Sequence, residues 1–386
     1  MENVVISKLG RAKIGQFNIG SKVDIGFLTN FFYNNITEIK SILDSKPDIF
    51  GQEIYDNLFK KNELPYTLNK QEELFILKNK NNFQITFDYL TFRYKFLRCG
   101  RDKVNIGYPP YLLIEPVSTC NLRCPFCFQT DKSFTKKPYM GIIDYDLFTK
   151  IVDEASDLGV GAVTLASRGE PTLHKKLTEM MEYLGSKKNI YEKKLNTNAT
   201  FLSDKIAHSI FTNEFTQIII SADHYEKGEY ERLRKNSNFE KILKNVDNLF
   251  NIREKYYPKS ITEIRISGVD HDKNLDRTKF RNFWMKRADQ VTAGYPLERW
   301  DTYFNIPHEE INDPCEYLWD RMYVWWDGKV NPCDADYKSY LSYGNFNDNS
   351  IKEIWNGKKI NEHRNYHINN LRNKVNPCDR CGVCFK

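Results

Sequence analysis

Three cysteines stand close together in a chain of 386 residues that holds nine in total. Cys120, Cys124 and Cys127 form the spacing CxxxCxxC in the stretch STCNLRCPFCFQT. Three thiolates on one loop can bind three irons of a cubane iron–sulfur cluster and leave the fourth iron open to another ligand. A structural zinc ion would ordinarily take a fourth ligand nearby in the sequence, or a second CxxC pair. The spacing therefore favours an iron–sulfur site with an open position, and a zinc knuckle is the alternative.

A second group of cysteines lies near the C-terminal end of the chain. Its members are Cys315, Cys333, Cys378, Cys381 and Cys384. The first two enclose Gly328 in a Cx12GxxxxC pattern, and the other three form CxxCxxC in PCDRCGVC. Four thiolates can hold one cubane cluster or one structural zinc ion. The fifth cysteine, Cys384, is then a spare residue, an alternative ligand or a reactive thiol.

Composition and charge limit the binding partners and the cellular compartment that we expect for this protein. No apolar run approaches the roughly 20 residues of a transmembrane helix, and the first residues lack the apolar core of a signal peptide. We therefore expect a cytoplasmic protein without a membrane span, in which thiols stay reduced rather than form disulfides. The 57 basic and 51 acidic residues are interspersed, which argues against a nucleic-acid partner.

Predicted strands and helices alternate regularly along the chain, and these elements must position the first cysteine loop. Short apolar runs predict strands at 111–118, 161–167, 193–199, 217–223, 262–270 and 288–295. Helical spacing of apolar residues predicts helices at 145–159, 175–188, 204–213, 239–256 and 276–287. Alternating strands and helices favour parallel strands with crossover helices, whose active sites lie at the carboxyl ends of the strands. Helices are also expected within 27–46 and 71–98.

These features together resemble the radical S-adenosylmethionine (SAM) enzyme superfamily. The spacing CxxxCxFC, with Phe126 just before the last cysteine, matches its signature and follows the first strand of the alternating region. The resemblance implies an α/β fold with a partial (βα)6 TIM-like barrel over residues 109–300. Residues 1–108 would then be a helical N-terminal extension of unknown role, and residues 301–386 a small C-terminal iron–sulfur domain.

The resemblance also implies a set of cofactor-binding residues. Gly169, Glu170 and Pro171 stand where the family has a GGEP-like motif, whose backbone and glutamate hold the amino group of SAM. Arg168 replaces the usual first glycine. Family members place ribose- and carboxylate-binding groups at the ends of the third and fourth strands, and a YEKIR-like segment follows. In this chain those positions are Asn196, Asn198, Ser221, Asp223 and Arg234.

The C-terminal cysteines resemble the SPASM/twitch auxiliary-cluster domain of the same superfamily. A full SPASM domain carries seven cysteines for two clusters, so five cysteines imply a twitch-like arrangement with one auxiliary [4Fe-4S] cluster. The ligands would be Cys315, Cys333, Cys378 and Cys381. A structural zinc ion bound by four cysteines is the alternative.

The chemistry that the resemblance implies is cleavage of SAM to a 5′-deoxyadenosyl radical, which abstracts hydrogen from a substrate. If the auxiliary cluster accepts an electron, the net reaction is an oxidation and needs a base. Asp334 and Asp336, directly after Cys333, are the candidates, with solvated loop acids as the alternative. His174, His224 and His271 follow strand ends, and His224, beside Asp223, is the favoured one for a role in the site.

The leading hypothesis is a radical SAM oxidoreductase of dehydrogenase or epimerase type that acts on a sugar, nucleotide-sugar or cyclitol. The auxiliary cluster would accept an electron or position the substrate, and flavodoxin or ferredoxin would supply electrons. The segments CEYLWDR and GNFNDNSIKEIWNG look like those of surface-polysaccharide pathways. The second hypothesis is a peptide-modifying or sulfatase-type maturase, with residues 1–108 docking a precursor, although no winged-helix pattern is traceable there. The third is a non-catalytic metal-binding scaffold or RNA-binding factor.

Overall fold

The structure is a computed structural model that describes residues 5–6, 12–13, 17–18, 25–296, 302–307 and 312–381. The chain forms two compact units, residues 20–104 and the remainder. Residues 1–19 belong with the larger unit, where the short strands within them lie. The single helical extension expected over residues 1–108 is therefore divided, because only its central part forms a separate helical unit.

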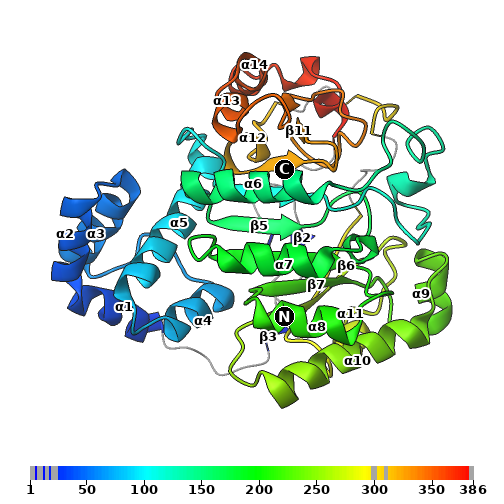
Figure 1. Ribbon diagram of the computed structural model, residues 1–386, viewed down its shortest axis with the longest axis horizontal. Coiled ribbons are helices and arrows are strands. Elements are labelled where there is room, and N and C mark those ends of the chain that lie inside the picture. The colour runs from blue at the N-terminus through cyan, green and yellow to red at the C-terminus, as the bar shows by residue number, and fades with distance from the viewer. Residues whose placement is uncertain are drawn as a thin grey trace. The chain divides into compact units, whose positions relative to one another are not determined.

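The smaller unit consists of five helices, drawn in blue and cyan in Figure 1. They are α1 (Ile25–Asn34), α2 (Ile36–Ser45), α3 (Ile49–Lys61), α4 (Lys70–Lys78) and α5 (Phe83–Asp102). Each of the two helical stretches expected from the sequence is split in two. The side chain of Asn82 accepts a hydrogen bond from the amide of Ile85 and begins α5 there, as asparagine commonly does at a helix N-terminus. Helix α3 was not predicted; Asp48 caps it.

A ten-stranded sheet forms the centre of the larger unit, in the order β12-β11-β10-β4-β5-β6-β7-β8-β9-β3. Its six central strands are β4 (Tyr111–Ile114), β5 (Ala162–Leu165), β6 (Glu192–Thr197), β7 (Gln217–Ser221), β8 (Glu263–Val269) and β9 (Gln290–Gly294). Neighbours among these six pair in parallel. The sheet has two edges and does not close, which confirms the predicted partial (βα)6 barrel.

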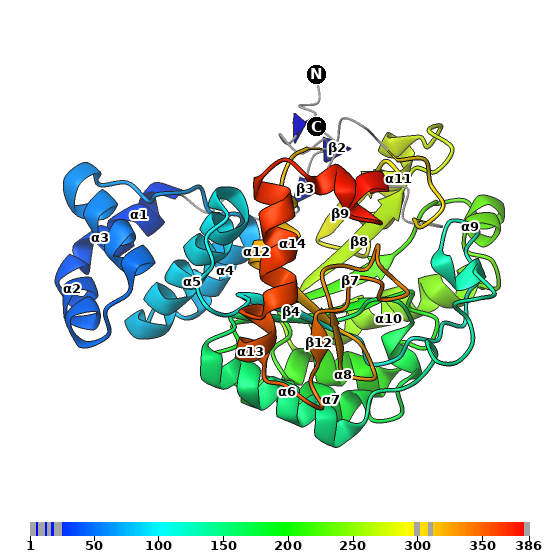
Figure 2. The same ribbon diagram turned by 90° about the horizontal axis from the view of Figure 1, so that it is seen from above.

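Helices cover the outer face of the six parallel strands. They are α6 (Tyr145–Leu158), α7 (Leu177–Ser186), α8 (Asp204–Thr212), α9 (Lys227–Leu233), α10 (Phe239–Tyr256) and α11 (Arg277–Trp284), with the 3₁₀ turns η1 (Phe128–Thr130) and η2 (Pro171–Leu173). Figures 1 and 2 show α6, α7 and α8 on the outer side of the strands. All predicted helices of this region are present, and α9 is additional. Apolar strand residues such as Ile264 and Ile266 pack with α10 residues such as Val246 in one core.

The C-terminal region continues the same sheet rather than forming a detached module. Its elements are α12 (Tyr317–Asp320), β10 (Met322–Val324), β11 (Lys329–Asn331), β12 (Gly344–Asn345), α13 (Ile351–Trp355), α14 (Lys358–Ile368), η3 (Arg372–Lys374) and η4 (Cys378–Arg380). Strand β10 pairs antiparallel with β11 and parallel with β4. Strands β10 and β11 form a hairpin, and β10 is hydrogen-bonded to β4, the strand that precedes the first cysteine loop.

Short strands lie at the N-terminal end of the chain. They are β1 (Val5–Ile6), β2 (Ala12–Lys13) and β3 (Phe17–Asn18). Strand β3 pairs antiparallel with β9 and occupies one edge of the large sheet.

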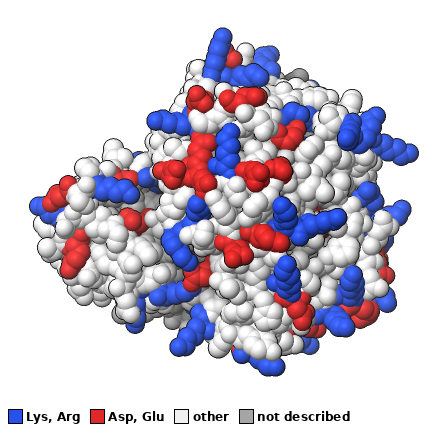
Figure 3. All heavy atoms as spheres, in the orientation of Figure 1, with Lys and Arg blue, Asp and Glu red and all other residues white. Residues whose placement is uncertain are grey.

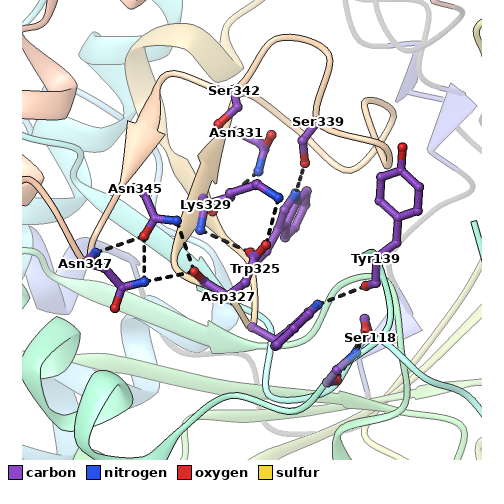
Figure 4. Close-up of polar contacts among 12 residues, drawn as sticks. Ser118, Tyr139, Trp325, Asp327, Lys329, Asn331, Ser339, Ser342, Asn345 and Asn347 are labelled. Carbon is purple, nitrogen blue, oxygen red and sulfur yellow. Dashed lines mark hydrogen bonds and ion pairs between the residues drawn. The ribbon is translucent and has the colours of Figure 1, made fainter. Parts of the chain in front are cut away.

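The turn of the β10–β11 hairpin is held by side chains of the following segment (Figure 4). Asn345 and Asn347 both donate to the carbonyl of Asp327 at 3.1 Å. Gly328 has φ +80°, a conformation that glycine adopts without strain. The indole of Trp326 donates to the carbonyl of Tyr139 at 2.9 Å, so the hairpin is fixed to the segment between β4 and α6.

The molecular surface mixes both signs of charge. Figure 3 shows lysine and arginine side chains interspersed with aspartate and glutamate over the face in view. Within the described residues, no helix combines the length and apolar character needed to cross a membrane.

Candidate active site

The first three cysteines lie on the loop between β4 and α6. The amide of Cys127 donates to the carbonyl of Cys124 at 3.0 Å, and the amide of Leu122 contacts the sulfur of Cys120 at 3.4 Å. Burial raises the pKa of Cys120 to about 11 and that of Cys127 to about 12. The thiols are thus neutral near neutral pH, and a metal that binds here must displace their protons.

The spacing of the sulfurs bears on the kind of metal. Sulfurs around one zinc ion lie about 3.8 Å apart, because Zn–S bonds are about 2.3 Å long and tetrahedrally arranged. Among the described residues, the group of three ligand atoms found within 4.8 Å of one another is His363, His367 and Cys378. The loop cysteines are not part of this group, and three thiolates on one loop suit a cubane cluster, in which each thiolate binds a different iron.

Gly169 lets the loop after β5 lie directly against the cysteine loop. A Cβ atom at this position would stand 2.2 Å from the carbonyl oxygen of Val117 and 2.4 Å from that of Thr119. The amide of Glu170 donates to the same Thr119 carbonyl at 2.9 Å. Pro171 follows as the first residue of η2. The three residues of the predicted GEP motif thus form one tight turn beside the cysteines.

Glu170 is a buried carboxylate between the ends of β5 and β6. It accepts hydrogen bonds from the hydroxyls of Thr172 and Thr197 at 2.5 and 2.6 Å and from the amide of Asn198 at 2.8 Å. Burial raises its pKa. Within the described part of the chain, Glu170 has no lysine or arginine partner. A buried carboxylate without a cation is suited to receive an ammonium group from a ligand.

The two asparagines at the end of β6 lie in different surroundings. Asn198 is buried, and its amide nitrogen donates to the side chain of Asn121 at 3.0 Å and lies 3.8 Å from the sulfur of Cys120. The side-chain oxygen of Asn196 is buried without a hydrogen-bond partner in the described structure. Asn198 therefore positions the cysteine loop, whereas Asn196 retains an unused acceptor.

Three further predicted residues gather at the end of β7, together with a histidine. Arg234 forms a two-point ion pair with Asp223, at 2.8 and 3.1 Å. Burial alone would lower the pKa of Arg234, but Asp223 and the neighbouring Cys124 hold it above its usual range. The guanidinium lies 5.8 Å from the ring of Phe126, which stacks on His271 with centroids 3.6 Å apart.

His271, rather than His224, is the histidine of this cluster. Its Nε2 lies 4.0 Å from Asp223, whereas His224 accepts a hydrogen bond from the nearby amide of Glu226 in its own loop. His174 likewise hydrogen-bonds to backbone groups, the carbonyl of Ile143 and the amide of Lys176. The sequence placed all three past strand ends, but the stacking on Phe126 depends on loop geometry.

Arg168, the departure from the usual glycine, connects the barrel to the C-terminal region. Its guanidinium pairs with Glu115, which is fully buried, and donates to the carbonyl of Tyr337 at 2.8 Å. It also lies 4.2 Å from the ring of Trp325. The side chain is therefore fully engaged with protein groups and does not occupy the space beside Glu170.

The inner face of the barrel is polar and accessible. Along β6 to β9, the outward residues are buried, and from the third residue of each strand onward the alternate inward residues remain partly exposed. The inward positions are Lys194, Asn196, Ile219, Ser221, Arg265, Ser267, Val269, Thr292 and Gly294. Six of these nine residues have polar side chains. The predicted residue Ser221 is one of them and pairs in register with Ser267.

Four of the C-terminal cysteines come together around the hairpin. Cys315, Cys333 and Cys381 pack in one cluster, and burial raises the pKa of Cys333 and of Cys378. Cys378 interacts electrostatically with Cys315 and Cys381. Cys384 lies outside the described residues.

Two histidines from α14 accompany these cysteines. The Nε2 atom of His363 lies 3.3 Å from the sulfur of Cys378, and its Nδ1 is hydrogen-bonded to the hydroxyl of Tyr343. His367 accepts a hydrogen bond from the amide of Cys315 at 3.1 Å. Burial lowers the pKa of His363 to about 4. These histidines were not predicted, because nothing in the sequence relates α14 to the cysteines before the fold is known.

Comparisons with known proteins agree with this geometry. The family model described as Radical SAM superfamily matches residues 114–282, and the model described as SPASM, an iron-sulfur cluster-binding domain, matches residues 315–384. The chain belongs to the radical SAM superfamily. This radical SAM enzyme carries its SPASM domain after the barrel, as predicted. Its cofactors are SAM and a [4Fe-4S] cluster, with auxiliary iron–sulfur binding in the SPASM domain.

Individual relatives of this radical SAM enzyme are distant. A tungsten-containing aldehyde ferredoxin oxidoreductase cofactor-modifying protein of Pyrococcus furiosus is 23% identical over 71% of this chain and 88% of the relative. A GTP 3′,8-cyclase of Thermodesulfovibrio yellowstonii is 24% identical over 46% of this chain and about half of the cyclase, at 53%.

Solved structures share the fold of this radical SAM enzyme. BtrN in complex with AdoMet and 2-DOIA has a TM-score of 0.51 and 20% identity over 71% of this chain and 92% of its own. SuiB of Streptococcus suis has a TM-score of 0.55 and 14% identity over 95% of this chain and 94% of its own.

The residues present fit the cofactors of a radical SAM enzyme. Three cysteines on one loop leave one iron of a cubane open, and Glu170 beside them lacks a cation of its own among the described residues. Cys120, Cys124 and Cys127 would hold the cluster, and Glu170 would receive the amino group of SAM. The four described C-terminal cysteines supply one further complete set of thiolates.

The two predicted catalytic aspartates differ in their surroundings. Asp336 is fully buried and accepts hydrogen bonds from the hydroxyl of Tyr303 at 2.8 Å and from the amides of Tyr340 and Leu341. Burial raises its pKa to about 6. These three bonds hold the loop after β11 together. Asp334 is partly exposed beside Cys333.

Proposed function

We propose that this radical SAM enzyme oxidises a small polar metabolite, of the sugar, nucleotide-sugar or cyclitol class, inside its barrel. The observation that carries the proposal is the inner face of β6 to β9, whose alternate positions are polar and partly accessible. A substrate with several hydroxyl groups could hydrogen-bond to these side chains, whereas an apolar one would leave them without partners. The resemblance of two C-terminal segments to surface-polysaccharide enzymes favours the same class.

We assign a separate role in the reaction to each of the site residues. When bound and reduced, the first cluster supplies one electron to SAM and so gives methionine and a 5′-deoxyadenosyl radical. Glu170 would bind the amino group of SAM, while Phe126 and the Asp223–Arg234 pair would lie beside the bound SAM. Asp336 is occupied by its own loop, so proton removal from the substrate is assigned to Asp334.

The C-terminal domain supplies the second half of an oxidation. We assign one auxiliary [4Fe-4S] cluster to Cys315, Cys333, Cys378 and Cys381, with the role of accepting the electron that the substrate loses. Strand β10 of this domain is hydrogen-bonded to β4, which precedes the first cysteine loop. The two cysteine sites thus share one sheet, which supports electron transfer between a substrate in the barrel and the auxiliary site. An external flavodoxin or ferredoxin would supply reducing electrons.

A peptide-modifying role is the competing proposal. It draws on the likeness to SuiB, one structure of which is bound to precursor peptide SuiA. The described part of residues 20–104 contains helices α1 to α5 and no strand, whereas a winged-helix docking domain would add a hairpin. The polar barrel interior favours the small metabolite.

The test begins with anaerobic reconstitution with iron and sulfide, followed by SAM and dithionite. Wild-type protein should form 5′-deoxyadenosine and hold about eight irons, and Cys120→Ala should abolish cleavage. Deuterated cell extract, divided into a metabolite fraction and a peptide fraction, is then added. Deuterium in 5′-deoxyadenosine from the metabolite fraction supports the proposal. Deuterium from the peptide fraction alone, or no cleavage by loaded protein, contradicts it.

A further inference from the structure

Arg265 stands at the centre of β8 and faces the inside of the barrel. Its neighbours Ile264 and Ile266 are fully buried against the outer helices, so the alternation of the strand directs Arg265 inward. In register it lies beside Ile219 of β7 and Gln290 of β9. It therefore belongs to the polar inner face described above.

The guanidinium of Arg265 has few partners. One nitrogen donates to the hydroxyl of Thr292 at 3.2 Å, and the buried Nε has no hydrogen-bond partner in the described structure. The nearby Glu263 instead accepts from the side chain of Gln217. Burial lowers the pKa of Arg265, against the opposing effect of Glu263. The positive charge of Arg265 is thus only partly compensated.

Two other basic residues of the barrel, Arg253 and Lys194, are paired with carboxylates. Arg253 pairs with Asp289 and also donates to the carbonyl of Thr262. Lys194, the other cation of the inner face, pairs with Glu192 at 2.7 Å. Folded proteins rarely leave a buried charge without a partner, because no interaction then compensates for the hydration that the charge has lost. Where they do, the site is commonly functional.

Arg265 also has neighbours that suit a polyhydroxylated ligand. Asn196, whose buried side-chain oxygen lacks a partner, pairs in register with Ile219, and Ile219 pairs with Arg265. Ser267, which follows two residues later on the same face, pairs with Thr292. A guanidinium offers several donors in one plane, which matches the oxygens of a carboxylate or a phosphate.

We propose that Arg265 binds an anionic group of the substrate, a carboxylate or a phosphate. The substrate is then a sugar acid or a sugar phosphate, held by Arg265 inside the barrel with a hydroxyl donating to Asn196. This assignment rests on the proposed function, because it takes the barrel interior as the substrate site. The anion occupies the donors of Arg265 that the protein leaves unused.

The test uses matched probes on the reconstituted full-length enzyme with SAM bound. Titration calorimetry compares glucose 6-phosphate, glucuronate and glucose. At least one anionic probe should bind tenfold or more tightly than glucose, and Arg265→Gln should remove that difference, while Arg265→Lys keeps part of it. Arg287→Gln, which alters an arginine that follows α11 and pairs with Asp247 of α10, is the control and should change nothing. Equal binding of all three probes, or unchanged binding by Arg265→Gln, overturns the proposal.

Two further measurements separate this proposal from its alternatives. Arg265→Met should leave the unfolding midpoint in urea unchanged or raise it, because a partly buried charge with few protein partners is removed. Arg253→Met should lower it. A drop for Arg265→Met as large as that for Arg253→Met would indicate a structural arginine and overturn the proposal.

SAM cleavage without substrate is measured in parallel. A loss in Arg265→Gln equal to that of Cys120→Ala would assign the arginine to the cofactor and overturn the inference. Failure of the wild-type enzyme to cleave SAM would instead contradict the proposed function itself.

Discussion

At the scale of single residues, Asp223 and Arg234 form a buried ion pair near the first cysteines. The carboxylate is fully buried, and the side chain of Arg234 is 12% exposed. Asp223 also accepts from the amide of Val269 at 2.9 Å, so one carboxylate joins the ends of β7 and β8 to Arg234. Removing either charge would leave the other buried and unpaired.

We predict that Asp223→Asn lowers the free energy of unfolding by about 3–5 kcal/mol, as expected when one partner of a buried ion pair is lost. Urea denaturation of the unreconstituted protein measures this. Asp272→Asn, which removes the exposed partner of Arg232, is the matched control and should cost less than about 1 kcal/mol. Equal losses for the two variants would contradict the prediction.

His363 presents a different single-residue effect at the auxiliary site. Because the hydroxyl of Tyr343 can donate to Nδ1, the proton on Nε2 points to the sulfur of Cys378. A hydrogen bond to a ligand thiolate stabilises the reduced form of an iron–sulfur cluster. His363→Phe should therefore shift the midpoint potential of the auxiliary cluster to a more negative value.

A redox titration followed by electron paramagnetic resonance measures this potential. His208→Phe, which alters a histidine bonded to Tyr257 on the barrel surface, is the control and should leave it unchanged. An unshifted potential in His363→Phe, with full iron content, would show that the contact has no electronic effect.

At the scale of elements, the loops after β4, β5 and β6 form one assembly through backbone contacts. At Gly169 the loop after β5 lies directly against the cysteine loop, because carbonyl oxygens of the cysteine loop lie where a side chain would begin. Gln129 of η1 adds a further connection by donating to the carbonyls of Ser118 and Arg168 at 2.7 and 2.6 Å. The geometry of the cysteine loop is thus set by its neighbours.

We predict that Gly169→Ala separates these loops, lowers the free energy of unfolding by about 1–3 kcal/mol, and weakens SAM binding at least tenfold. Calorimetric titration of reconstituted enzyme with SAM measures the affinity. Gly228→Ala in α9 is the control, since its Cβ would meet no atom within 4 Å. If both variants bind SAM as the wild type does, the close approach at Gly169 is unimportant.

At the scale of the whole molecule, polar contacts connect the barrel to the SPASM domain. Arg168 of the barrel donates to the carbonyl of Tyr337 at 2.8 Å, and Asp131 forms an ion pair with Lys338 at 2.7 Å. Burial alone would raise the pKa of Asp131, but hydrogen bonds from Lys338 and Ser133 hold it well below its ordinary value. The joint between the two domains therefore depends on a charged carboxylate.

The lowered pKa of Asp131 predicts how the stability of the folded protein depends on pH. A carboxyl group with a depressed pKa in the folded state stabilises the protein above its unfolded pKa, near 4, and this stabilisation is lost as pH falls further. The urea midpoint of the wild type should fall with acidification below about pH 4 more steeply than that of Asp131→Asn. Parallel pH profiles of the two proteins, with Lys338→Met as a second variant, would contradict this.

The sequence alone determined the chemistry of the cysteines and the type of fold. Ligand type and spacing, CxxxCxxC after a strand, depend on neighbouring residues in the chain, and six alternations of strand and helix leave few topologies. Phe126, Glu170, Asp223 and Arg234 were predicted from the resemblance to the radical SAM superfamily, whose motifs stand close to the cysteines or the strand ends.

Only the tertiary structure decided which distant residues share a site. His271 stacks on Phe126, and His363 reaches Cys378, through loop and helix packing that has no local sequence signal. The joining of β10 to β4 depends on edge hydrogen bonds between segments some 200 residues apart. The inward direction of Arg265 required the strand register, since a shift by one residue would have placed it among the outer helices.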